Sequence, residues 1–126
     1  MDIELSKAYV DAKRYGTLDE KLFYMFECSE KEDDVLLCRD ARYDLGRAFL
    51  HGEGIRKDRA QAMELLKSSA DMGNFKAMEL VGQLLIEDGL AEEGNAYLKQ
   101  AKETKLPDEE LDAIARNIAR LMRNRM

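Results

Sequence analysis

The chain has 126 residues, of which 45% are hydrophobic and 37% charged, enough apolar content for the core of one domain and too much for a disordered chain. Its 26 acidic residues against 20 Lys and Arg give a net charge of -6, which argues against nucleic-acid binding, because phosphate contacts need concentrated positive charge. No apolar run is long enough to span a bilayer, and the acidic start does not resemble a signal peptide. We therefore expect a soluble, cytoplasmic protein without membrane insertion.

The composition predicts an all-helical fold, because Ala, Leu, Glu, Lys and Met are frequent and the only proline is Pro107. Two capping boxes, Thr17 to Glu20 and Ser29 to Glu32, predict helix starts, and glycines predict the breaks. Together these signals predict seven helices, approximately over residues 3–14, 17–28, 29–51, 59–72, 75–88, 90–104 and 107–126.

An internal repeat runs through the middle of the chain. Three residues recur 36 positions later, so that Ala41, Leu45 and Gly46 correspond to Ala77, Val81 and Gly82. Farther on, Leu65, Leu66 and Lys67 recur 32 positions later as Tyr97, Leu98 and Lys99, which places a four-residue deletion in the loop around 88–94. A glycine inside a helix costs stability, so its repetition predicts two helix backbones that pack too closely for a methyl group.

Residues 41–73 resemble a Sel-one-like repeat, with the pattern A-x3-L-G-x2-Y-x2-G-x-G-V-x2-D, then A-x2-W-Y and small residues ending in Gly. The positions that match are Ala41, Leu45, Gly46, Gly52, Gly54, Asp58, Ala62 and Gly73. Phe49, Ile55 and the Leu65-Leu66 pair replace the usual Tyr, Val and Trp-Tyr. Residues 74–104 form a degenerate copy, which keeps Ala77 and Gly82 but lacks the double-glycine loop, and 1–40 a degenerate N-terminal hairpin.

The resemblance implies an α/α solenoid of about three antiparallel helix hairpins in a single domain, related to tetratricopeptide arrays. A solenoid needs shielded ends, so we expect the helix over 107–126 to act as a cap. Its apolar stripe would face the array and consists of Leu111, Ile114, Ala115, Ile118, Leu121 and Met122.

The sequence offers little for catalysis or metal binding. Cys28 and Cys38 are expected to be buried, reduced thiols, and with His51 as the only histidine we reject a zinc site and expect no cofactor. The carboxylate pairs, such as Asp33-Asp34, lie at predicted helix starts, where acids favour the helix dipole. We therefore predict a protein that is not an enzyme; a small hydrolase using His51 remains an alternative.

A binding surface is the stronger prediction. Tyr43, Arg47 and Leu50 share one face of the third helix, and a shift of 36 positions gives Glu79, Gln83 and Ile86. The resemblance places such a face on the concave side of a solenoid, where partners dock, with Tyr43 and Leu50 as anchors and Arg47 reading a carboxylate. The alternative is that Tyr43 or Leu50 packs on a neighbouring helix.

The predicted function is a protein–protein interaction module that binds a partner protein or peptide. Proteins that resemble this family are commonly adaptors in bacterial signalling, envelope or host-interaction pathways. A dedicated neutraliser, such as an immunity protein or antitoxin, is an alternative, because the acidic charge suits a basic target. The concave face could instead close on a second copy in a homodimer.

Overall fold

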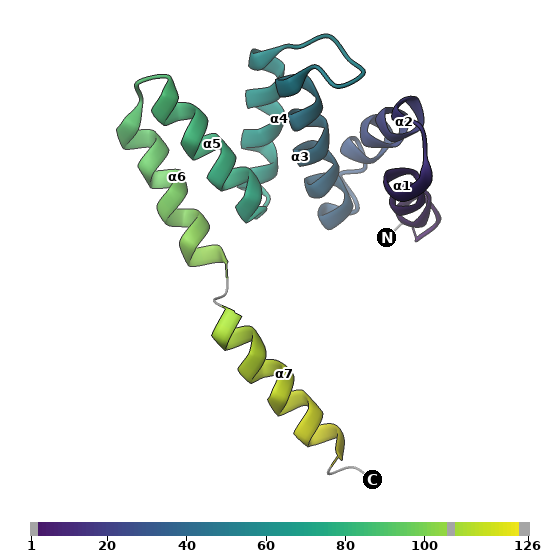
Figure 1. The fold of residues 1–126 in the computed structure, drawn as a ribbon, viewed down its shortest axis with the longest axis vertical. Coiled ribbons are helices and arrows are strands. Elements are labelled where there is room, and N and C mark those ends of the chain that lie inside the picture. The colour runs from purple at the N-terminus through teal and green to yellow at the C-terminus, as the bar shows by residue number, and fades with distance from the viewer. Residues whose placement is uncertain (1–2, 106–107, 124–126) are drawn as a thin grey trace.

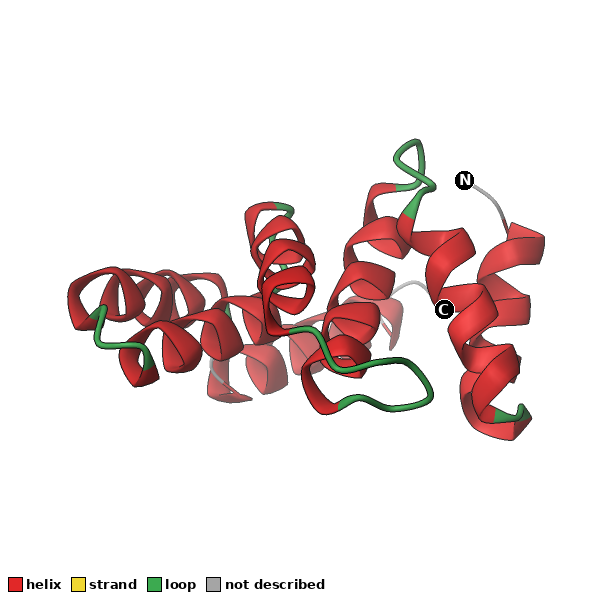
Figure 2. Cartoon of the chain, turned by 90° about the horizontal axis from the view of Figure 1, so that it is seen from above, coloured by secondary structure: helices red, strands yellow, loops and turns green. Residues whose placement is uncertain are grey.

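The computed structural model describes residues 3–105 and 108–123, with side chains from residue 113 onward in the second range. These residues form seven helices and no strand (Figures 1 and 2). The helices are α1 (Ile3–Tyr15), α2 (Leu18–Ser29), α3 (Val35–His51), α4 (Arg59–Asp71), α5 (Phe75–Glu87), α6 (Ala91–Thr104) and α7 (Asp108–Arg123). The predicted all-α class is confirmed, and the helix ends agree with the sequence to within a few residues except at the start of α3.

Consecutive helices pack on one another from α1 to α6, most extensively within the α3–α4 and α5–α6 hairpins. The largest core cluster lies where these two hairpins meet: Leu50 of α3, Ala62 and Leu66 of α4, and Val81, Leu84 and Leu85 of α5. A second cluster holds the N-terminal hairpin against α3 through Tyr9, Cys28, Leu37 and Ala41. The predicted solenoid of helix hairpins is therefore present.

The two helical glycines lie at close helix crossings, as their repetition predicted. A Cβ atom on Gly46 would come within 2.8 Å of Leu66 Cγ, and one on Gly82 within 2.8 Å of the Gly94 carbonyl oxygen. Real Cβ atoms do not approach other heavy atoms this closely, so neither site has room for a methyl group. Gly46 faces Leu66 and the Ala62 carbonyl oxygen, and Gly82 faces Leu98 and the Gly94 carbonyl oxygen. These partners are 32 positions apart in the two hairpins, which confirms the internal repeat in three dimensions.

One predicted cap is wrong. Ser29 is the last residue of α2, where its hydroxyl donates to the Phe26 carbonyl at 2.8 Å, and it does not start α3. The N-cap of α3 is Asp34, whose carboxylate accepts a hydrogen bond from the Leu37 backbone N–H at 3.4 Å. The other box behaves as predicted, because the Thr17 hydroxyl accepts from the Glu20 N–H at 3.2 Å.

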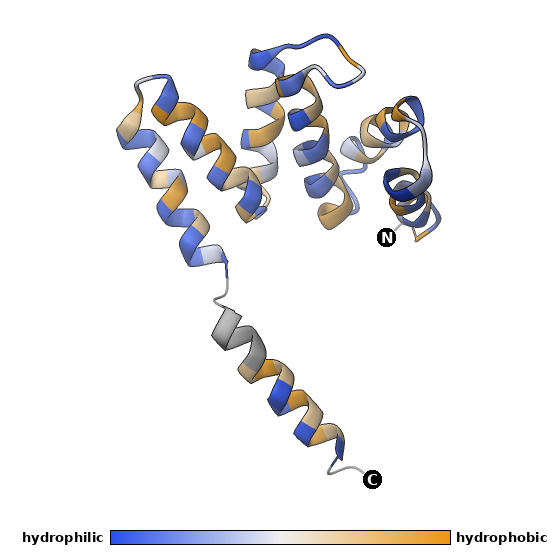
Figure 3. Cartoon of the chain, in the orientation of Figure 1, coloured by the Kyte–Doolittle hydropathy of each residue, from blue (hydrophilic) through white to orange (hydrophobic). Residues whose placement is uncertain are grey.

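The last helix also differs from its prediction. In the described residues α7 has no extensive contact with another helix, so its stripe does not pack on the array as predicted. Figure 1 shows α7 running away from α6, and Figure 3 marks hydrophobic positions along α7 in orange. The exposed fractions are 48% for Ile114, 52% for Ile118, 62% for Leu121 and 65% for Met122. Leu111 lies outside the residues whose side chains are described.

None of the helices in the described ranges has both the length and the apolar character needed to cross a membrane.

Candidate protein-binding groove

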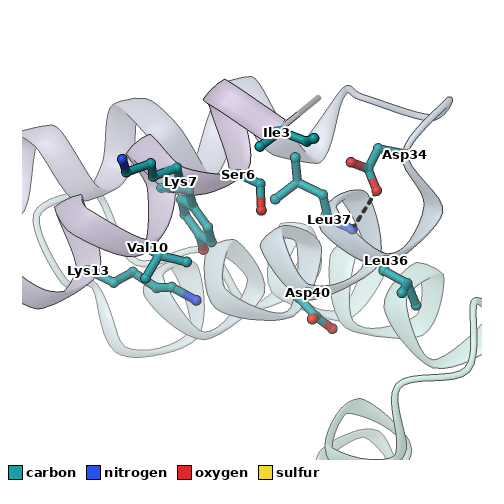
Figure 4. A pocket seen from close by; sticks show the side chains of 10 residues that line it. Ile3, Ser6, Lys7, Val10, Lys13, Asp34, Leu36, Leu37 and Asp40 are labelled. Carbon is teal, nitrogen blue, oxygen red and sulfur yellow. Dashed lines mark hydrogen bonds between the residues drawn. The ribbon is translucent and has the colours of Figure 1, made fainter. Parts of the chain in front are cut away.

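The first hollow of the candidate site lies between α1 and α3 (Figure 4). It has a volume of about 550 Å³, and its rim carries exposed apolar side chains: Ile3 at 72%, Val10 at 47% and Leu36 at 56%. Tyr9 and Leu37, both buried, line it as well. Exposed aliphatic groups gathered around a concavity are typical of surfaces that bind other proteins.

A second hollow, of about 520 Å³, continues along α3 toward α5 and shares Lys13 and Asp40 with the first. It is more polar, and its other side chains include those of Arg39, Tyr43, Asp44, Asn74, Phe75, Lys76 and Thr104. Because two residues belong to both hollows, we treat them as one feature, the α1–α3–α5 groove. The first helix of each hairpin thus contributes to it.

Asp44 joins the two sides of the groove. Its carboxylate accepts a hydrogen bond from the Tyr9 hydroxyl, and its Oδ2 atom lies 3.5 Å from Lys13 Nζ. The Lys13 ammonium also stands 4.4 Å from the centre of the Tyr9 ring. Burial, and secondarily the charge of Asp44, raise the pKa of Tyr9 well above its usual value, so its hydroxyl stays protonated as a donor.

Asp40 is engaged in a similar way. Its Oδ1 atom lies 3.0 Å from Arg39 Nε and accepts a hydrogen bond from Asn74 Nδ2 at 3.2 Å. Lys76, at the α5 side of the groove, is exposed and has no ion-pair partner among the described residues. Asp40 and Asp44 are therefore compensated within the chain, and Lys76 offers a positive charge to a ligand.

The predicted binding residues are only partly brought together. Tyr43 lines the groove, half-buried, with the Arg47 guanidinium 5.7 Å from its ring centre. Glu79 is half-buried, while Gln83 and Ile86 are exposed, and none of the three lines the groove. Tyr43 also packs against two core clusters, which bears out the predicted alternative of packing on a neighbouring helix.

Leu50 was wrongly predicted as an exposed anchor. Only 8% of its surface is exposed, because α4 and α5 cover this end of α3 and place Leu50 among Leu66 and Val81. The groove instead uses the beginning of the same stripe. Leu36, Asp40 and Tyr43, which line it, stand at i, i+4 and i+7 of α3 and share one face of the helix.

Sequence reasoning missed the contribution of α1 and of the start of α5. Ile3, Val10 and Lys13 share one face of α1, and this apolar-basic stripe was the available signal. Phe75 and Lys76 begin α5, and the Asn74 N-cap before them accepts from the backbone N–H groups of Lys76 and Ala77 at 2.9 and 3.1 Å.

The residues considered for catalysis lie apart from the groove. His51 is exposed at the end of α3, where Gly52 follows it in the left-handed conformation with φ 70°. Cys28 and Cys38 are buried and unbridged, as predicted, and burial raises the pKa of the Cys38 thiol, which disfavours the reactive thiolate. Among the described residues, no three His, Cys, Asp or Glu side chains are grouped so as to hold a metal ion.

A protein-family model matches the part of the chain that includes most of α3, the central helix of the groove. The Sel1 repeat family model matches residues 39–74, which include most of α3 and all of α4. Residues 39–74 are a Sel1 repeat. The resemblance predicted for 41–73 is confirmed, and Sel1 repeats are helical repeats that mediate protein–protein interactions. No curated protein and no solved structure matches the chain.

The Sel1 repeat supplies the middle of the groove. Arg39, Asp40, Tyr43 and Asp44 lie within it, while Lys13 and Lys76 come from the flanking helices. Within the repeat, the Ser69 hydroxyl of α4 donates to the Arg39 carbonyl of α3 at 2.7 Å, which fixes the start of α3 against its hairpin partner.

Proposed function

We propose that this protein is an interaction module that binds a segment of a partner protein in the α1–α3–α5 groove. The observation that supports this most is the continuity of an apolar hollow and a polar hollow through Lys13 and Asp40. A Sel1 repeat forms the centre of the groove, and such repeats mediate protein interactions. A partner segment would place aliphatic side chains between α1 and α3 and polar groups beside α5.

The chemistry of the groove favours a partner segment with apolar side chains at one end and a carboxylate at the other. Ile3, Val10 and Leu36 offer apolar contact, which suits anchors at helical or extended spacing. Lys76 lines the second hollow and has no ion-pair partner among the described residues. Its ammonium group suits a carboxylate of the partner. Tyr43 and Arg47 extend this end, and Gln83 and Ile86 stay predictions for a larger partner.

Cross-linking of the protein in native lysate, followed by mass spectrometry, tests the proposal. Three lysines line the groove, Lys7, Lys13 and Lys76, whereas Lys99 and Lys102 lie exposed on α6 away from it. We expect the partner to be linked through the groove lysines. Links confined to Lys99 and Lys102 would contradict the proposed surface, and a toxic enzyme as the partner would identify the module as a neutraliser.

A further inference from the structure

The strongest uncovered apolar surface outside the groove lies on α7. Ile114, Ile118, Leu121 and Met122 stand at i, i+4, i+7 and i+8 and therefore share one face of the helix. All four are at least 48% exposed, and α7 has no extensive contact with another helix in the described part of the chain. A helix with one apolar face usually covers that face against another element.

The order of charges along α7 indicates what covers this face. Residues 108–112 contain four acids and no base, whereas 113–123 contain Arg116, Arg120 and Arg123 and no acid. The helix is therefore negative at its beginning and positive at its end. A second helix of the same sequence complements this order only when it runs antiparallel, because a parallel copy would place like charges side by side.

We propose that α7 pairs in an antiparallel manner with α7 of a second copy of the chain. A two-fold axis near residue 116 brings each acidic beginning beside the arginines of the other copy, and places the apolar stripes over 111–122 of the two copies against each other. Such a contact is closed, because each copy contributes the same surface. The arrangement leaves the α1–α3–α5 groove of each copy free, so it is independent of the function proposed above.

The other occupants fit this charge order less well. An anionic membrane surface would attract the arginines but repel the four acids at the beginning of α7 and a chain of net charge -6. A pair of helices with 16 residues each, about 24 Å long, buries a small interface. We therefore expect the self-association to be reversible and to depend on concentration.

Sedimentation equilibrium of the full chain, from about 1 μM to about 1 mM, covers the range of weak protein association and tests the pairing. We expect a monomer–dimer equilibrium that Ile118→Glu shifts toward monomer by at least about tenfold, since a charge would be buried in the interface. Ala119→Glu adds the same charge one residue along, on the polar side of α7, and is expected to retain the dimer.

Two further variants test the orientation and the charges. In an antiparallel pair, the two cysteines introduced by Ala115→Cys lie near the axis and form a disulfide with each other. The two cysteines introduced by Met122→Cys lie far from the axis and from each other, so they do not. An Arg120→Glu/Arg123→Glu chain and an Asp108→Lys/Glu109→Lys chain should each dimerise poorly alone and pair well when mixed.

Several results would overturn the proposal. A wild-type chain that stays monomeric to about 1 mM, far above the dissociation constants of most functional contacts, would do so. Equal effects of Ile118→Glu and Ala119→Glu would do so as well, as would cross-linking through position 122 but not 115. Loss of the dimer on Leu36→Glu would show that α7 instead occupies the groove of the second copy, which is also incompatible with paired α7 helices.

Discussion

Tyr9 of α1 donates its hydroxyl hydrogen bond to the Asp44 carboxylate of α3, 35 residues farther along the chain. Tyr9 is 1% exposed, so this bond joins the N-terminal hairpin to the Sel1 repeat from inside the groove wall. Lys13, on the next turn of α1, pairs with the same carboxylate and keeps its charge compensated. This contact and the apolar cluster of Tyr9, Cys28, Leu37 and Ala41 together join α1 to α3 beside the first hollow.

Replacement of Tyr9 by phenylalanine tests the contact. Tyr9→Phe keeps the ring among Cys28, Leu37 and Ala41 but removes the donor to Asp44. We expect the free energy of unfolding to fall by about 1.5–3 kcal/mol, the usual contribution of a hydrogen bond to a charged group. Urea denaturation at pH 7 measures the change.

Tyr15→Phe is the matched control, because Tyr15 is 80% exposed at the end of the same helix. The same chemical change there should leave the unfolding free energy within about 0.5 kcal/mol of wild type, as is usual for surface substitutions. Equal losses in the two variants would show that the Tyr9 hydroxyl does not stabilise the contact.

The protonation of Tyr9 gives a second, pH-dependent prediction. Its pKa is raised by burial and by Asp44, so folded Tyr9 stays neutral at a pH where an unfolded tyrosine, with a pKa near 10.0, has ionised. The stabilisation is complete below pH 10 and is lost above it, because the folded state then binds more protons than the unfolded state.

Comparison of wild type with Tyr9→Phe isolates this effect from the other titrating groups. The difference in unfolding free energy between the two chains should stay constant from pH 7 to about 9.5 and then fall by about 1.4 kcal/mol per pH unit. Urea denaturation across this range measures it. A difference that is constant to pH 11 would mean that Tyr9 ionises in the folded chain as easily as in the unfolded one.

The helical glycines give a prediction about packing. Gly46→Ala should lower the unfolding free energy by about 1–3 kcal/mol despite the better helix propensity of alanine, because the new methyl overlaps Leu66. Gly82→Ala should cost more, since its methyl meets the Gly94 carbonyl oxygen, a backbone atom that cannot rotate away.

A double-mutant cycle checks the cause. Leu66→Ala removes the side chain that Gly46→Ala would strike, so the two changes together should cost less than the sum of the separate costs. Thermal or urea denaturation of the four chains gives the coupling. Simple additivity would contradict the steric explanation.

The features that the sequence predicted well are local or repeated. Each of these features depends on a few neighbouring residues, as the Thr17 cap and the helix breaks do. The glycines at 46 and 82 are also repeated, and this repetition argued that their helical positions were not accidental. The Ser29 cap failed because Asp34 lies close behind it and competes for the same role, with Ser29 already inside α2. Local signals of equal strength do not show which one the folded chain uses.

The groove could not be predicted from periodicity alone. A helical stripe shows which side chains share a face, as with Leu36, Asp40, Tyr43 and Arg47, but not where a neighbouring helix covers that face. Leu50 is buried because α4 and α5 pack over it, and the first hollow lies between α1 and α3, which pack on each other less extensively than consecutive helices from α1 to α6 do. The sequence likewise placed Ile114, Ile118, Leu121 and Met122 on one face of α7 but did not show that the array leaves them exposed.

The most direct test of the central claim compares two adjacent residues of α3. Leu36 is 56% exposed inside the groove, and Val35 is 52% exposed outside both hollows. The amount of partner captured from native lysate by Leu36→Glu and by Val35→Glu is measured by quantitative mass spectrometry, once both variants are shown to melt like wild type. A groove that binds the partner predicts a loss of at least about tenfold for Leu36→Glu, as for the central anchor of an interface, with Val35→Glu unchanged. Equal capture by the two variants, whether retained or lost, would contradict it.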